Sequence, residues 1–364
     1  MSNTWGTEDK FDQCAYKARE ENILREINAC AELGIDLLQI DDGWQIRSGE
    51  DSWLPAKKGP SRAYREDDLP VLHDGSVLPE SYDVYPNGFT TVREGAKKAG
   101  ISLGLWHAWT APLSALKANF DSGSFKAFKL DFARLDKKES FDNLYYKARN
   151  IIKYSRYNLV VNWDVTETVP RMGFYFGRDC GNLYLANRKA YTVRKEVQYD
   201  PWQILRDAWE LADYINLNKI QLTFQNKDLT PDTAKTEAIR YPHAYNLAVT
   251  LMASPIFFTE IQYLSKQAMR ELKPIIAKYK TERNSIYQGY VFAIGSKPDN
   301  QSWTGFQNYN PVTGGGYLTV FRELNNEANS ARIALHFMKP GTKIKLTNIL
   351  TGERKWVTLN EGND

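Results

Sequence analysis

Short apolar runs alternate with longer stretches of helical periodicity up to about residue 265. In the first helical stretch, residues 17–33, apolar residues recur every three or four positions, and Gly34 supplies a stop. Strands separated by helices are typical of a parallel sheet. Eight runs predict strands: Thr4–Gly6, Ile35–Ile40, Ser102–Trp106, Ala127–Phe132, Asn158–Trp163, Asn182–Ala186, Lys219–Phe224 and Pro255–Thr259.

Eight strand–helix units within about 265 residues match the size of a (β/α)8 TIM barrel. The alternative is an open doubly wound sheet, but no glycine-rich phosphate loop follows the first strand. The sequence therefore predicts an α/β fold with the barrel over residues 1–282.

The pattern changes after a last helix predicted at Ser265–Lys280. Short strands with Gly, Pro and Asn turns between them predict a C-terminal antiparallel β-sandwich domain over residues 283–364. The expected strands are Tyr290–Ile294, Ser302–Gln307, Tyr317–Phe321, Arg332–Phe337, Lys343–Thr347 and Lys355–Leu359.

Charge and composition exclude some classes of partner. The net charge is only +3 and Lys and Arg are scattered, so no basic patch for nucleic acid or an anionic membrane is expected. No apolar run approaches the ~20 residues of a membrane span. Aromatic residues reach 13%; most should lie in the core, but their faces also stack on sugars.

Cysteines and histidines indicate neither disulfides nor metal. The three cysteines, Cys14, Cys30 and Cys180, form no CxxC pair, which fits a reducing compartment. The polar N-terminus lacks a hydrophobic secretion segment, so a cytoplasmic location is predicted. The four histidines show no metal-ligand spacing, and no cofactor is expected.

Candidate catalytic residues are expected at the carboxyl ends of the strands, where barrel enzymes form their active sites. The second strand ends in Asp41 and Asp42, with Trp44 close behind. Adjacent carboxylates can accept two neighbouring sugar hydroxyls while an indole stacks on the ring. A polar turn that caps the next helix is the alternative.

The fourth strand carries Lys129 and Asp131, which alternation places on the same face, toward the barrel mouth. A nearby ammonium should lower the pKa of Asp131 and keep it ionised. An ionised carboxylate is what a glycosidic nucleophile requires. A structural ion pair inside the barrel is the alternative.

Aromatic residues lie near the same strand ends. Trp106 and Trp109 on the third strand could wall a sugar pocket, and Trp5 could close its floor. His107, between the two tryptophans, is expected to be a hydrogen-bonded core residue.

In combination these segments resemble glycoside hydrolase family 36. The resemblance rests on LGIDLLQIDDGWQ at 33–45, FKLDF at 128–132 and Trp5 before the first helix. It is strongest to the α-galactosidase and melibiase branch, with kinship to family 27. LGLWHAW at 103–109 also resembles the raffinose-synthase branch, and residues 199–228 are similar to bacterial members. The similarity extends over nearly the whole chain.

The resemblance implies a retaining hydrolase of terminal α-galactosides or α-N-acetylgalactosaminides, acting through a covalent glycosyl-enzyme. It implies an oligosaccharide or glycoside substrate, no metal or organic cofactor, and a homo-oligomer as one form of assembly. It assigns Asp131 as nucleophile, with substrate-binding residues Trp5, Asp41, Asp42, Trp44, Trp106 and Lys129.

The sequence departs from the family at the second carboxyl, which acts as acid and then base. In the family it follows the sixth strand, but residues 187–193 contain no carboxylate. Arg188 in that segment fits a substrate-binding arginine. Asp200 is the favoured acid/base, with Glu196 and Asp179 as other candidates, and Asp164 is interpreted as an orienting or sugar-binding residue. Family members also carry a large N-terminal β-domain, whereas this sequence begins almost at the first barrel strand.

Three functions stay open at this point. The first is the hydrolase. The second is a raffinose-synthase-like transglycosylase, suggested by the WHAW stretch. The third is a catalytically impaired sugar-binding barrel, suggested by the missing acid/base. Replacing Asp131 with Asn separates the enzymes from the binding protein, because only an enzyme would lose turnover.

Overall fold

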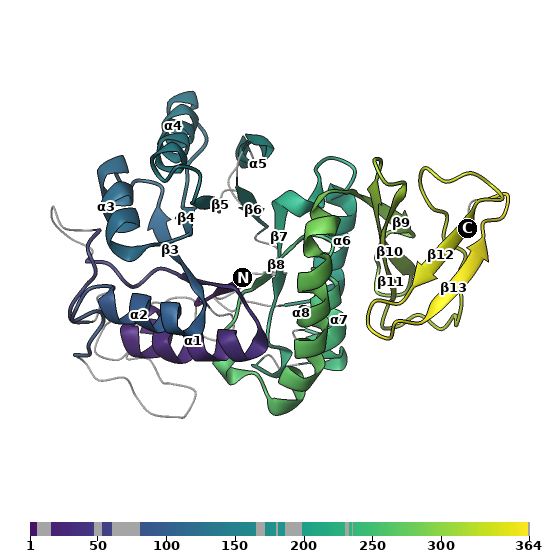
Figure 1. The fold of residues 1–364 in the computed structure, drawn as a ribbon, viewed down its shortest axis with the longest axis horizontal. Helices are drawn as coiled ribbons and strands as arrows, with labels where there is room; N and C mark the ends of the chain where they lie inside the picture. The colour runs from purple at the N-terminus through teal and green to yellow at the C-terminus, as the bar shows by residue number, and fades with distance from the viewer. Residues whose placement is uncertain are drawn as a thin grey trace.

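The computed structural model describes residues 1–5, 16–46, 53–59, 81–164, 172–179, 181–185, 199–229, 233–234 and 236–362. The predicted barrel is confirmed: parallel strands β1 to β8 close in chain order (Figure 1). Their bounds are β1 Ser2–Asn3, β2 Leu37–Ile40, β3 Ser102–Ala108, β4 Ala127–Asp131, β5 Val160–Trp163, β6 Asn182–Tyr184, β7 Ile220–Phe224 and β8 Ser254–Phe257.

The first strand lies two residues earlier than predicted, at Ser2–Asn3 rather than from Thr4. Ser2 pairs with Leu38 of β2 on one side and Phe257 of β8 on the other, so this short strand closes the barrel. Two residues are too few to show alternation, which is why the pattern did not fix their register.

Helices follow the strands as the periodicity indicates. In α1, buried Ile23, Ile27 and Cys30 face the barrel, and the helix ends at Gly34, whose φ of 91° favours glycine. No helix in the described ranges is long and apolar enough to cross a membrane. The helices are α1 Glu20–Leu33, α2 Thr90–Ala99, α3 Leu113–Gly123, α4 Lys138–Tyr154, α5 Phe176–Asp179, α6 Pro201–Leu211, α7 His243–Ala248 and α8 Lys266–Tyr287.

A buried carboxylate joins α1 to the segment after β8. Glu26 accepts hydrogen bonds from the backbone amides of Ile261 (2.6 Å) and Gln262 (3.1 Å) and from the Ser2 hydroxyl (3.3 Å). Burial, with the neighbouring Glu260 carboxylate, raises the pKa of Glu26 to about 8. Glu26 is therefore mostly protonated at neutral pH.

The barrel interior holds a layer of amide side chains. Asn162 of β5 donates to Gln39 of β2 (2.8 Å) and accepts from Gln221 of β7 (3.2 Å). Because side chains alternate along a strand, Asp41 and Asp164, two residues beyond Gln39 and Asn162, point to the same interior one layer closer to the carboxyl end.

The C-terminal part contains two separate antiparallel sheets, ordered β11-β10-β9 and β12-β13. Trp209 of α6 donates to the carbonyl of Ile294 in β9 (3.1 Å), on the side of the barrel where α6 and α8 face these sheets (Figure 1). Helix α8 continues to Tyr287, past the predicted domain boundary at residue 282. The strands are β9 Tyr290–Gly295, β10 Trp303–Asn310, β11 Gly315–Arg322, β12 Lys343–Thr347 and β13 Arg354–Thr358.

The strand predicted at Arg332–Phe337 is wrong, because this segment forms no regular strand. His336 is held instead by the side chain of Gln307, which accepts from its amide (2.7 Å) and donates to its carbonyl (3.0 Å). A side-chain amide here replaces the backbone partner that a strand would have.

Candidate active site

A charged cluster occupies the carboxyl ends of β2, β4 and β5. Its centre is Lys129, which is 4% exposed. Three carboxylates approach its ammonium: Lys129 Nζ lies 3.1 Å from Asp41, 3.3 Å from Asp131 and 3.0 Å from Asp164, in each case from Oδ2. The structure thus brings Asp41, Lys129 and Asp131 together, and it adds Asp164 to them.

Hydrogen bonds fix the two acidic residues after β2. Asp41 Oδ2 also accepts from Asn3 of β1 (2.7 Å), and its Oδ1 accepts from the Asp42 amide (2.9 Å). Asp42 accepts from the Gln45 side chain (2.9 Å). Both aspartates are 2% exposed. Asn3 was missed at the sequence level, because a two-residue strand gives no pattern that assigns its side chain to the interior.

One ion pair and two hydrogen bonds hold the Asp131 carboxylate. Besides Lys129, the Trp106 indole donates to Oδ2 (2.8 Å) and the Phe132 amide to Oδ1 (2.6 Å). Phe132 has a φ of 60°, a left-handed conformation that a bulky residue rarely adopts. Strain of this kind clusters at functional sites. It leaves the Phe132 ring 58% exposed, with its centroid 5.7 Å from that of Trp106.

The pKa of Asp131 is shifted in the direction opposite to the one predicted from the sequence. Burial and the nearby Asp164 carboxylate raise the pKa of Asp131, against the opposing effects of Lys129, Trp106 and the Phe132 amide. The predicted lowering is wrong because burial of Asp131 and the Asp164 carboxylate together outweigh the effect of Lys129. Burial alone would lower the pKa of Lys129, but the carboxylates raise it well above its usual range. Lys129 is therefore charged.

Aromatic rings cover one side of the ammonium. Tyr184 at the end of β6 stacks on Phe258 just after β8, with centroids 5.1 Å apart. Lys129 Nζ lies 5.5 Å from the first ring centroid and 5.7 Å from the second, within cation–π range. Trp5, 6% exposed, joins this small aromatic cluster. Tyr184 and Phe258 were not predicted as site residues.

Trp44 lies in the core, so the prediction that its indole stacks on a sugar is wrong. It is fully buried, donates to the Trp106 carbonyl (2.9 Å) and packs on Phe89. His107 is a core residue as predicted, with Nε2 3.1 Å from the Asn119 amide nitrogen. Burial lowers the pKa of His107 to about 3, so the imidazole is neutral.

The candidates for the second carboxyl lie elsewhere. Asp179 precedes β6, at the amino end of the barrel, is half exposed and lies 3.9 Å from Arg149. Asp200 precedes α6, and its Oδ1 accepts from the Thr236 hydroxyl (2.8 Å) and the Glu237 amide (3.1 Å). Neither carboxylate is among the described partners of the Lys129 ammonium. Arg188 and Glu196 lie outside the described residues.

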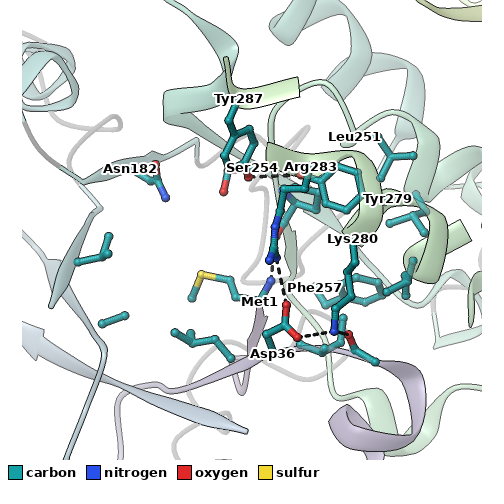
Figure 2. A pocket seen from close by; sticks show the side chains of 18 of the residues that line it. Met1, Asp36, Asn182, Leu251, Ser254, Phe257, Tyr279, Lys280, Arg283 and Tyr287 are labelled. Atoms are coloured by element: carbon teal, nitrogen blue, oxygen red, sulfur yellow. Dashed lines mark hydrogen bonds and ion pairs between the residues drawn. The ribbon is translucent and has the colours of Figure 1, made fainter. Parts of the chain in front are cut away.

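A cavity of about 220 Å³ opens at the opposite end of the barrel. Figure 2 shows Lys280 and Arg283 of α8 reaching Asp36 at its edge. Several of its lining residues are the first residues of strands: Leu37, Ala127, Val160, Asn182 and Ser254. Barrel enzymes bind and convert their substrates at the carboxyl ends of the strands. The Lys129 cluster, which lies at that end, is therefore the candidate active site.

Within the described ranges, no group of three or more His, Cys, Asp or Glu side chains is arranged to hold a metal ion. The acidic cluster around Lys129 already has a cation of its own, the ammonium.

No protein-family model matches the chain, and no curated protein matches its sequence. Its fold is similar to that of GH36 α-galactosidases. The GH36 α-galactosidase AgaA from Geobacillus stearothermophilus aligns with a TM-score of 0.62 at 13% identity, over 94% of this chain and 50% of that one. The galactosidase domain of AgaSK aligns with a TM-score of 0.64 at 14% identity, over 97% and 50%.

A GH27 β-L-arabinopyranosidase from Geobacillus stearothermophilus aligns with a TM-score of 0.56 at 10% identity, over 98% of this chain and 91% of that one. The chain therefore spans about half the length of the GH36 proteins and nearly all of the GH27 enzyme. Variants of AgaA are known in complex with raffinose and stachyose. At these identities the similarity establishes the barrel fold.

Proposed function

We propose that the protein is a retaining glycoside hydrolase that cleaves terminal α-galactosides or α-N-acetylgalactosaminides, with Asp131 as nucleophile. The observation that carries the proposal is the fixed Asp131 carboxylate at the carboxyl end of the barrel, which forms an ion pair with Lys129 and accepts hydrogen bonds from Trp106 and the Phe132 amide. When the nucleophile is already held in one orientation, less entropy is lost in reaching the transition state.

The charge of the cluster supports this chemistry. The transition state of glycoside cleavage resembles an oxocarbenium ion, with positive charge on the sugar ring. Three carboxylates around one ammonium leave an excess of negative charge at the site. Fixed charges of the opposite sign stabilise such a transition state.

The surrounding side chains supply the groups expected of a sugar site. Asp131 and Asp164 are partly exposed, at 13% and 11% of their side chains. The exposed Phe132 ring beside Asp131 offers a face on which the carbon side of a sugar can stack. In this proposal Lys129 and Asp41 orient the sugar hydroxyls.

One observation favours a different function. Asp200, the acid/base favoured from the sequence, is bound to Thr236 and Glu237 and not to the cluster. Without a second carboxyl the barrel would bind sugars but hydrolyse them poorly. That alternative is a catalytically impaired sugar-binding barrel.

Turnover of aryl α-galactoside and aryl α-N-acetylgalactosaminide tests the proposal. Asp131→Asn should lower kcat/KM at least about a thousand-fold. Catalytic residues that act together lose most of their combined rate enhancement when one of them is removed. Asp36→Asn, at the other end of the barrel, is the matched control and should stay within about two-fold of wild type. Wild-type protein that binds galactose without turnover would establish the binding protein instead.

A further inference from the structure

A second carboxyl group lies beside Asp131 at the end of the neighbouring strand. The Asp164 amide donates to the Leu130 carbonyl of β4 (3.0 Å), which sets Asp164 next to Asp131. Both Oδ2 atoms contact Lys129 Nζ, at 3.3 Å and 3.0 Å. They are therefore at most about 6 Å apart, compatible with the ~5–5.5 Å between the carboxyls of retaining glycosidases.

Exposure separates this pair from the third carboxylate. The side chains of Asp131 and Asp164 are 13% and 11% exposed, whereas that of Asp41 is 3% exposed. Asp131 and Asp164 are therefore more accessible to a reacting sugar than Asp41, which is more deeply buried.

The partners of Asp131 are of the kind that stabilise a carboxylate. Two carboxyls that share one partly buried site do not both ionise readily, so they titrate as a pair. Asp131 forms an ion pair with an ammonium and accepts hydrogen bonds from an indole and a backbone amide, and such partners favour its ionised form. These partners oppose the rise in the pKa of Asp131 that burial and Asp164 cause, which suits Asp131 to react as the carboxylate of the pair.

We infer that Asp164 is the general acid/base that works with Asp131, an inference that rests on the proposed function. The Asp131 carboxylate attacks the anomeric carbon, the bond to the leaving oxygen breaks, and that oxygen takes its electron pair and the Asp164 proton. The Asp164 carboxylate then takes a proton from water, whose oxygen attacks the anomeric carbon and releases Asp131 as a carboxylate. Asp200 has no part in either step.

Leaving-group dependence distinguishes this role from a structural one. A dinitrophenyl group leaves without acid assistance, whereas a phenyl group needs it. Asp164→Ala should hydrolyse phenyl α-galactoside at least about 100-fold more slowly than wild type, the usual size of a general-acid contribution. With dinitrophenyl α-galactoside the first step should survive and appear as a burst of dinitrophenol.

Azide gives a second readout that a structural role would not produce. In Asp164→Ala, sodium azide should occupy the space of the lost carboxyl, attack the Asp131 ester and release α-galactosyl azide. In an Asp131→Gly variant, azide would attack the substrate directly and yield the β-anomer. The isosteric Asp164→Asn, checked by thermal unfolding, should show the same leaving-group dependence if the alanine variant is unstable.

The outcomes separate the two proposals. If Asp131→Asn is inactive while Asp164→Ala and Asp164→Asn cleave phenyl α-galactoside normally, this inference is overturned and the proposed function stands. If Asp200→Ala shows the burst and the azide rescue instead, Asp200 is the acid/base. If wild-type protein does not turn over either aryl glycoside, the proposed function itself is wrong.

Discussion

At the carboxyl end of the barrel one ammonium, that of Lys129, is shared by three carboxylates; at the amino end one carboxylate, that of Asp36, is shared by Lys280 and Arg283. The first cluster is buried, with the lysine side chain 5% exposed. The second is open to solvent, with Asp36 48% exposed. The same types of residue therefore form ion clusters of opposite charge balance.

The difference in burial indicates which of the two clusters has a chemical role. An exposed ion pair is screened by water and contributes only ~0–1 kcal/mol, enough to help fix α8 on the barrel. A buried excess of carboxylates is costly, because each charge loses its hydration. Groups with strongly perturbed pKa values cluster at functional sites, which makes the buried cluster the candidate for chemistry.

Removing the shared ammonium should have the largest effect. Lys129→Met leaves the buried carboxylates uncompensated and should lower the free energy of unfolding by ~3–5 kcal/mol at pH 7. It should also abolish turnover of aryl α-galactoside. Urea unfolding measures the first effect, and the loss should shrink as the pH falls and the carboxylates become protonated. A loss below about 1 kcal/mol would show that the Lys129 ammonium contributes no more to stability than an exposed ion pair does, which would contradict the account.

Glu26 extends the comparison to a buried carboxylate outside either cluster. Its pKa is about 8 in the folded protein, against 4.5 ordinarily. Between these values the folded state binds more protons than the unfolded state, so this group makes stability fall as the pH rises from about 4.5 to 8. Glu26→Gln removes this titration. Between pH 5 and pH 8 its free energy of unfolding, measured with urea, should fall less than that of wild type, by a difference on the order of 3 kcal/mol. Parallel pH profiles for the two proteins would contradict the assignment.

Trp106→Phe sharpens the account of Asp131 itself. The variant keeps an aromatic ring but removes the indole donor that lies 2.8 Å from Asp131 Oδ2. Hydrogen bonds to charged groups contribute about 1.5–3 kcal/mol, so kcat/KM should fall roughly 10- to 100-fold. The pKa of Asp131 should rise further, moving the acidic limb of the pH–rate profile to higher pH. The exposed Trp356 on β13 provides the control, since Trp356→Phe should change neither quantity.

The smallest effect is expected at the amino end. Lys280→Met removes one of two cations from the exposed Asp36 and should cost no more than about 1 kcal/mol, less in high salt. Its kcat/KM should equal that of wild type. A drop in turnover comparable to that of Trp106→Phe would mean that the two ends are coupled.

Local pattern was enough to predict the barrel, and it also indicated three of the residues that meet in the candidate site. Asp41, Lys129 and Asp131 lie at strand ends, where alternation sets the direction of each side chain. Trp44 lies past a turn, where alternation no longer applies, so its burial was not predictable. The raised pKa of Asp131 depends on its burial and on Asp164 of the neighbouring strand. The sequence shows neither how deeply a strand end is buried nor which carboxylates surround one ammonium.

The resemblance to family 36 predicts the second carboxyl in the segment after β6. Asp200 fits that prediction only by its position along the chain. The structure connects it to Thr236 and Glu237, and places Asp164 next to Asp131 instead. Contacts between strands, which decide such a pairing, carry no local signal in the sequence.

Trapping the covalent intermediate tests the central claim, that Asp131 is the nucleophile, most directly. 5-Fluoro-α-D-galactosyl fluoride combines a good leaving group with a slowed second step, so the glycosyl-enzyme should accumulate. Mass spectrometry of the intact protein should show the addition of one fluorogalactosyl group, and peptide mapping should place it on Asp131. A label on Asp164 or another residue, or turnover of aryl α-galactoside without any label on Asp131, would contradict the account.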